Sequence, residues 1–210
     1  LMLLNRSRAT VTRSDFYGND ATEAGALILV GDGVLDVRNS TFVSNNGGGI
    51  WFTSGGYGTV LYSSFAGNSY FNVTAALGAA HPTIMANNIF SKTNFASLYV
   101  HRSVESNTHI FNNLFYETAG SLLIGRVALV DIDSLNGADF AWDNIDGRPR
   151  FVSIDGNNVR LGDHRSAAID RGVDTPVPIP EPTQIPCLTN TDCELANARD
   201  SRFDIPAHHC

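Results

Sequence analysis

The sequence has almost no lysine and no long hydrophobic run. Of its fourteen basic residues only Lys92 is a lysine, and the formal net charge is −7. Nucleic-acid binding needs a concentration of basic side chains that neutralise phosphates, so we expect no nucleic-acid partner. Residues 1–4 and 122–124 are among the longest apolar runs. They fall far short of the ~20 residues of a transmembrane helix, so we expect no membrane span.

Cysteine is absent from most of the chain. Its three copies, Cys187, Cys193 and Cys210, all stand near the C-terminal end of the sequence. Any disulfide would therefore be local, and Cys187 with Cys193 is the candidate pair. This arrangement leaves one cysteine without a partner.

Charged residues are scarce, while short apolar runs and turn-forming residues are plentiful. Charged residues make up 17% and hydrophobic residues 43% of the chain, which also contains 19 glycines. Asn, Ser and Thr stand between the apolar runs, a pattern typical of many short strands. We therefore expect an all-β protein.

A regular repeat runs through most of the chain. Six phenylalanines follow one another at spacings of 26, 23, 25, 25 and 25: Phe16, Phe42, Phe65, Phe90, Phe115 and Phe140. Five positions before each is an apolar residue: Val11, Val37, Val60, Met85, Ile110 and Leu135. Two positions before are Ser14, Ser40, Ser63, Asn88, Asn113 and Ala138. Three positions after are Asn19, Asn45, Asn68, Thr93, Thr118 and Asp143.

This period, combined with short strands, predicts a solenoid. The leucine and asparagine spacing of a leucine-rich repeat is missing, which leaves a right-handed parallel β-helix of about six coils of ~25 residues. The phenylalanines would stack inside it. Each asparagine after a strand would adopt the left-handed backbone of a corner and bond to the matching asparagine of the next coil. The alternative is an irregular antiparallel sandwich.

A second apolar column follows each corner, at residues 26–30, 49–52, 74–77, 97–100 and 121–124. Unbroken apolar runs predict strands buried on both faces. If nothing in the chain covers the outer face, Ile28 and Trp51 would contribute to an exposed apolar stripe for docking. The alternative is that small residues fill the outward positions.

The first four residues match the same strand one coil earlier, so the chain begins in mid-coil. An uncapped coil exposes unpaired backbone groups. We therefore expect that residues before Leu1 are missing, or that another chain caps this end.

After Phe140 the periodic pattern ends, and the chain continues with the closing phrase "DNIDGRPRFVSIDGNNVRLGDHRSAAIDRG". The phrase resembles the closing segment of secreted bacterial β-helix proteins called choice-of-anchor Q proteins. The matches are Pro149, Phe151 and Val152, residues 157–161, Ser166, Ala168 to Asp170, Gly172 and, in degenerate form, residues 202–207. The resemblance implies an exported, often surface-attached protein and brings no catalytic residues. We divide the chain into coils (1–146), an irregular closing segment (147–172), a proline-rich strap or linker (173–186) and a cysteine-containing tail (187–210).

Few residues suggest chemistry. Asp131, Asp133, Asp143 and Asp146 are candidates for a cation site, with calcium the one cofactor left open, or for paired carboxylates. Asp is also an ordinary turn residue, and the histidines lack metal-ligand spacing, so we expect no metal site.

We expect a non-enzymatic β-helix in the periplasm, at the cell surface or outside the cell, which docks to other protein chains or to a surface as a structural or adhesive element. The alternative is a β-helix that binds or cleaves polysaccharide. In either case the candidate binding residues are Ile28, Trp51, Tyr57 and Tyr62, since exposed aromatic rings stack against sugars.

Overall fold

The structure is a computed structural model, which describes residues 2–4, 6–22, 25–75, 81–124, 127–129, 131–154, 158–162 and 165–168. All of them belong to one compact unit, Leu1–Gly172, while a second unit comprises Val173–Cys210. Cys187, Cys193, the proline-rich segment and the cysteine-containing tail lie outside the described residues.

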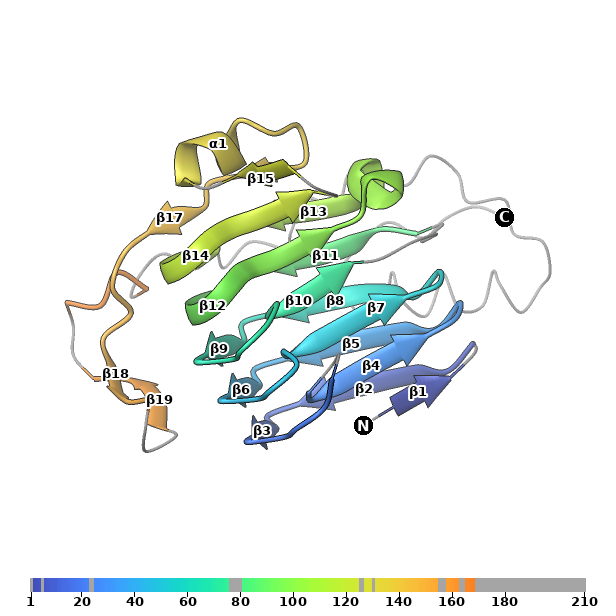
Figure 1. Ribbon diagram of the computed structural model, residues 1–210, viewed down its shortest axis with the longest axis horizontal. Coiled ribbons are helices and arrows are strands. Elements are labelled where there is room, and N and C mark those ends of the chain that lie inside the picture. The colour runs from blue at the N-terminus through green and yellow to red at the C-terminus, as the bar shows by residue number, and fades with distance from the viewer. Residues whose placement is uncertain are drawn as a thin grey trace, which may run out of the picture. The chain divides into compact units, whose positions relative to one another are not determined.

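The described residues form two large sheets of stacked strands and a hairpin (Figure 1). One sheet contains β1 (Met2–Leu4), β3 (Asp15–Tyr17), β4 (Leu27–Val30), β6 (Thr41–Val43), β7 (Ile50–Thr53), β9 (Ser64–Ala66), β10 (Val73–Ala75), β12 (Ile89–Val100), β14 (Leu114–Ile124), β15 (Val127–Leu129) and β17 (Ile145–Asp146). The other contains β2 (Arg8–Thr12), β5 (Val34–Arg38), β8 (Tyr57–Leu61), β11 (Thr83–Ala86), β13 (Thr108–Phe111) and β16 (Ala141–Trp142). The hairpin is β18 (Phe151–Ser153) with β19 (Asn158–Leu161), and the helices are η1 (Arg102–Asn107) and α1 (Ile132–Asn136).

Each strand of the coils pairs in parallel with the equivalent strand of the next coil. Phe16 pairs with Phe42, and Phe65 with Phe90, so residues of one sequence column lie above one another. The predicted parallel β-helix is therefore confirmed. In the later coils the strands on either side of the turn merge, and β12 pairs along most of its length with β14.

The phenylalanine column stacks inside the solenoid, as predicted. Ring centroids lie 4.8 Å apart from Phe16 to Phe42, 4.7 Å from Phe42 to Phe65, and 5.1 Å at the two following steps to Phe90 and Phe115. The last four of these rings are almost completely buried. Such offset stacks bury large apolar areas and add favourable ring interactions. The ladder spans about four regular turns of ~25 residues.

The sixth repeat predicted from the sequence is wrong in its register, because Phe115 pairs with Asp146 rather than with Phe140. The partner of Asn113 is accordingly Asn144 and not Ala138, at a sequence separation of 31 in place of the 25 between Asn88 and Asn113. The additional residues accommodate α1, whose Leu135 is buried. Phe140 is still buried in the core, but outside the ring stack.

The corner three residues before each stacked phenylalanine, and before Asp146 in the last coil, adopts the left-handed backbone conformation. Its φ values lie between 48° and 56° at Arg13, Asn39, Tyr62, Asn87, Asn112 and Asp143. The predicted left-handed asparagines Asn19, Asn45 and Asn68 are not among the residues with positive φ, so that part of the prediction is wrong. Their predicted amide ladder is confirmed, since Asn45 Oδ1 accepts from Asn19 Nδ2 at 2.8 Å and Asn68 Oδ1 accepts from Asn45 Nδ2 at 3.0 Å.

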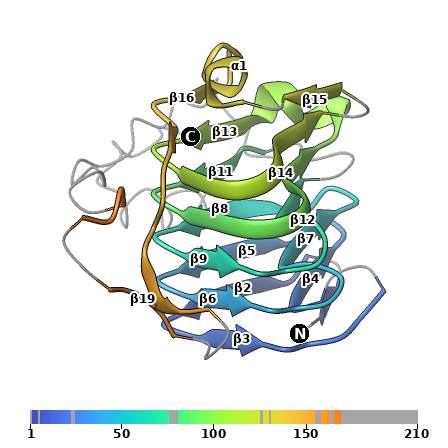
Figure 2. The same cartoon turned by 60° about the vertical axis from the view of Figure 1, so that its left-hand side comes forward.

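The closing segment leaves the solenoid after β17. Figure 2 shows it in orange, running down past the stacked strands toward β3. Ile154 of this segment lies close to Gly67 of the coils. If Gly67 carried a Cβ, that atom would lie 3.6 Å from Cγ2 of Ile154. The segment therefore flanks the corner side of the coils. Within the described part of the chain, no helix is long and apolar enough to cross a membrane.

Candidate functional site

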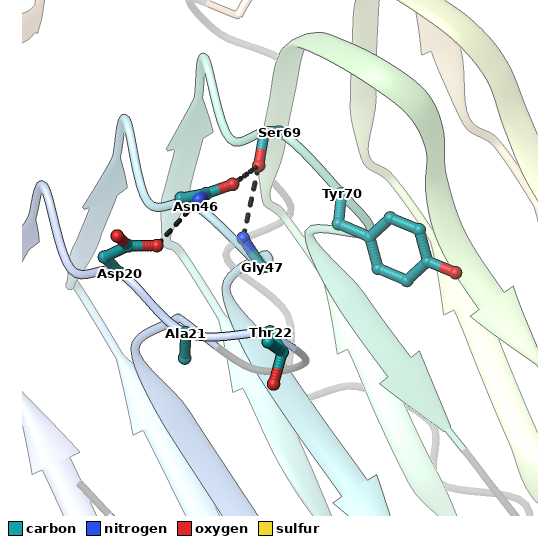
Figure 3. Close-up of a pocket in the computed structure, with 7 residues that line it drawn as sticks. All are labelled: Asp20, Ala21, Thr22, Asn46, Gly47, Ser69 and Tyr70. Carbon is teal, nitrogen blue, oxygen red and sulfur yellow. Dashed lines mark hydrogen bonds between the residues drawn. The ribbon is translucent and has the colours of Figure 1, made fainter.

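A shallow groove lies over the turns that follow β3, β6 and β9. We call it the turn groove; its volume is about 560 Å³ and it is lined by Asp20, Ala21, Thr22, Asn46, Gly47, Ser69 and Tyr70 (Figure 3). Three of its polar side chains, Asp20, Asn46 and Ser69, come from one sequence column, four residues after Phe16, Phe42 and Phe65. Stacking of the coils therefore brings together side chains that are far apart in the sequence.

Hydrogen bonds fix the polar side of the turn groove. Asn46 Nδ2 donates to Asp20 Oδ1 at 2.7 Å, and Ser69 Oγ donates to Asn46 Oδ1 at 2.7 Å. Ser69 Oγ also accepts from the backbone N–H of Gly47 at 3.1 Å. Asp20 and Asn46 are exposed, so this row remains accessible while each side chain is held in one orientation.

An aromatic platform borders the same groove. The rings of Tyr70 and Phe95 stack with centroids 5.3 Å apart, although the two residues are 42% and 43% exposed. Buried Phe71 meets both rings edge-on, at 4.5 Å from Tyr70 and 5.1 Å from Phe95. Figure 3 shows Tyr70 next to Ser69, with its ring directed away from the polar row. The platform is thus exposed on one side and supported from below.

The turn groove combines hydrogen-bonding groups with flat apolar rings, which is the combination that binds sugars. Among the described residues that line it, Asp20 is the only charged one. Glycoside hydrolysis usually requires two carboxyl groups on either side of the bond. The groove is therefore suited to binding an uncharged ligand rather than to this chemistry.

A second hollow, which we call the corner groove, lies between the coils and the closing segment. Its volume is about 620 Å³, and its lining is Tyr62, Asn87, Asn88, Ile89, Asn112, Leu114, Asn136, Asp143, Asn144, Ile145, Leu161 and Ala168. Tyr62, Asn87, Asn112 and Asp143 are its left-handed corner residues. Two residues singled out from the sequence, Tyr62 and Asp143, therefore line one groove.

The other aromatic candidates lie elsewhere. Trp51 on β7 is half-buried and pairs with Ile28 on one side and Thr74 on the other. The side chain of Ile28 lies outside the described residues. Burial on both faces, which the unbroken apolar runs predicted, holds for β10, where Thr74 and both its strand neighbours are buried, but not for β7, where buried and half-buried residues alternate. Tyr57 packs against His81, with ring centroids 4.5 Å apart. None of these residues lines either groove.

The four aspartates proposed for a cation site have separate positions. Asp131 caps α1 by accepting from the backbone N–H of Ser134 at 2.6 Å, and this bond lowers the pKa of its carboxyl group. Asp133 belongs to α1, Asp143 to the corner groove and Asp146 to β17. In the part of the chain that the structure describes, no three His, Cys, Asp or Glu side chains are grouped so as to hold a metal ion.

Sequence reasoning missed Tyr70 and Phe95. They come from different coils, since Tyr70 follows Phe65 by five residues and Phe95 follows Phe90 by five residues but on the merged strand β12. The only sequence signal is that both are aromatic at the same offset. Positions of one offset become adjacent when the coils stack.

The stacked parallel strands define the class of protein as a β-solenoid. A family model described as "Right handed beta helix region" matches residues 1–130. The chain therefore belongs to the right-handed β-helix family. No curated protein and no solved structure matches it.

Proposed function

We propose that this β-helix binds polysaccharide through the turn groove. The observation that carries the proposal is the exposed pair Tyr70 and Phe95, stacked beside the hydrogen-bonded row Asp20, Asn46 and Ser69. A sugar ring would lie against the aromatic faces while its hydroxyl groups bond to the polar row. Exposed apolar rings are costly to leave in water, which is consistent with a surface that is covered when a ligand binds.

The expected ligand is uncharged. None of the described residues that line the turn groove is a lysine or arginine, so an acidic polysaccharide would have no cation to pair with and would meet Asp20. The net charge of −7 also repels an acidic polysaccharide over longer distances. We infer a neutral, hydroxyl-rich glycan and binding without cleavage.

The proposal places the protein outside the cytoplasm, where such glycans are found. The resemblance of the closing segment to choice-of-anchor Q proteins supports this location. Part of the resemblance lies in the described hairpin, where Phe151 pairs with Leu161. The docking role predicted from the sequence is compatible with this proposal, because a cell-surface β-helix that holds glycan is also an adhesive element.

Affinity electrophoresis of the full chain tests the proposal. The gels would contain laminarin, xyloglucan, galactomannan or, as the anionic comparison, polygalacturonate. At least one neutral polymer should retard the wild type, and Tyr70→Ala should migrate as in the empty gel. Tyr17→Ala is the matched control, since Tyr17 is 55% exposed but lies outside the groove lining. The proposal fails if no neutral polymer retards the wild type, or if Tyr70→Ala is retarded as strongly.

A structural scaffold is the second candidate function. The phenylalanine stack and the asparagine ladders continue from coil to coil, which gives a regular and rigid body. Light scattering of the protein in its native extract distinguishes this role. A stable complex with other chains would favour the scaffold role, and a monomeric particle would not.

A further inference from the structure

We propose that the corner groove is a second glycan site, which holds a linear uncharged chain parallel to the solenoid axis with about one sugar unit per coil. The inference takes over from the proposed function the class of ligand, a neutral glycan, and in that respect rests on it. It depends on different residues, so the two proposals fail separately.

The size and lining of the corner groove suit a small part of a polymer. Its volume of about 620 Å³ lies within the range of ligand-binding pockets. Ile89, Leu114 and Ile145 come from consecutive coils and pair in register, so they form a continuous apolar floor. Leu161 of the closing segment adds an apolar wall. A pyranose ring also has an apolar face, which this floor can cover.

The polar side of the groove repeats at the coil spacing. Asn87 and Asn112 occupy the same corner of consecutive coils, with φ values of 56° and 52°, and Asp143 follows at 53°. Equivalent positions of stacked coils are about 4.8 Å apart. A ligand that bonds to all of them therefore needs a hydrogen-bonding group at each such step.

This spacing favours a glycan over a peptide. In an extended peptide, groups that face the same way recur every two residues, or about 6.6 Å, and would lose register with the corner residues after one coil. One pyranose unit of a linear glycan advances the chain by close to one coil step. The same row of side chains can thus bond to consecutive sugar units.

Asn112 offers a ligand an accessible hydrogen-bonding group at the centre of this row. Asn112 is a half-buried residue of the groove lining, and its backbone N–H donates to Trp142 O at 3.3 Å, which fixes the corner. Its side-chain amide is accessible at the groove, so a hydroxyl group of a ligand can bond to it in place of water. The described lining contains no lysine or arginine, and Asp143 is its only charged residue, so the ligand is uncharged.

Calorimetric titration of the full chain with cellohexaose, xylohexaose and mannohexaose, and with the corresponding disaccharides, tests the inference. At least one hexasaccharide should bind more tightly than its disaccharide, because it contacts more coils. Asn112→Gly should weaken this binding about fivefold, the effect of one lost hydrogen bond. Glycine accepts the left-handed backbone, so the corner should be retained, as the melting temperature would show.

Asn39→Gly is the matched control, since Asn39 occupies the same corner column with φ of 48° but is not in the groove lining. It should bind like the wild type. Asn112→Asp, which also tolerates this backbone, should weaken binding at least as much as Asn112→Gly. The inference is supported if both Asn112 variants weaken binding and Asn39→Gly does not, whatever the effect of Tyr70→Ala. If Tyr70→Ala leaves binding unchanged, only the turn-groove proposal is overturned.

Two results would overturn the inference. If Asn112→Gly and Asn39→Gly both bind like the wild type while Tyr70→Ala abolishes binding, the glycan occupies the turn groove alone and the proposed function stands. If the wild type binds no neutral oligosaccharide in calorimetry and no neutral polymer in the gels, both proposals are wrong.

Discussion

Asn113 and Asn88 are joined by two hydrogen bonds across consecutive coils. Asn113 Oδ1 accepts from the backbone N–H of Asn88 at 3.0 Å and from Asn88 Nδ2 at 3.0 Å. Asn113 Nδ2 in turn donates to Met85 O at 2.9 Å. Each buried asparagine of this ladder thus satisfies polar groups of its neighbours, and the ladder links the corners of the solenoid along its axis.

Replacing Asn113 by alanine should destabilise the protein by about 3 kcal/mol or more, because several buried polar groups lose their partners at once. Urea unfolding followed by circular dichroism measures the change. Ser14→Ala, at the first and half-buried position of the same column, should cost less than about 1 kcal/mol. Equal losses in the two variants would show that the ladder does not carry this stability.

Phe65→Ala should cost about 3–5 kcal/mol, since it removes a fully buried ring from the middle of the stack and leaves a cavity. Phe95→Ala should cost less than about 1 kcal/mol, because the ring of Phe95 is 43% exposed. Thermal unfolding of the two variants makes the comparison. A large loss in Phe95→Ala would mean that this ring is part of the core rather than a binding platform.

Gly48→Ala should prevent folding or cost several kcal/mol. A Cβ at this position would collide with the carbonyl oxygen of Phe71 in the next coil, and φ is 100°. Gly18→Ala is the matched control, because φ is 59° there and nothing lies within 4 Å of the added Cβ. It should cost only about 1–2 kcal/mol of backbone strain. Soluble yield and urea midpoints would reveal whether the two substitutions differ.

Stability should fall as the pH is lowered through the ordinary range of histidine. Burial lowers the pKa of His109, which lies 6.1 Å from the ring of Trp142. The unfolded chain therefore takes up a proton at this residue before the folded protein does, and the loss begins near pH 6.5 and levels off below the folded pKa. His109→Gln should show a smaller loss of urea midpoint between about pH 7.5 and pH 5. An identical pH dependence in both proteins would contradict this assignment.

The sequence was sufficient to predict the fold because one residue type recurs in each inward column. Phe16, Phe42, Phe65, Phe90 and Phe115 are all phenylalanine since only a large flat ring fills the interior and stacks on its copy. The sixth coil was misaligned because Phe140 happens to continue the spacing. The insertion of α1 displaces the register, and no periodic pattern signals such an insertion.

The corners and the grooves were less predictable for a different reason. The left-handed corner is a backbone requirement that Arg13, Asn39 and Tyr62 all meet, so the column shows no common chemistry. Tyr62 and Asp143 were recognised from the sequence as separate candidates, and their shared groove follows only from stacking. Tyr70 and Phe95 form a platform because merging of strands in β12 brings Phe95 beside the preceding turn.

The most direct test of the central claim is the dissociation constant of the full chain for the neutral polysaccharide that retards it in the gels. We would measure it for the wild type and for the double variant Tyr70→Ala/Phe95→Ala. Stacking interactions of two rings lead us to expect binding that is more than about tenfold weaker in the double variant, with unchanged unfolding cooperativity. Equal dissociation constants in the two folded proteins would contradict the assignment of the turn groove as the glycan site.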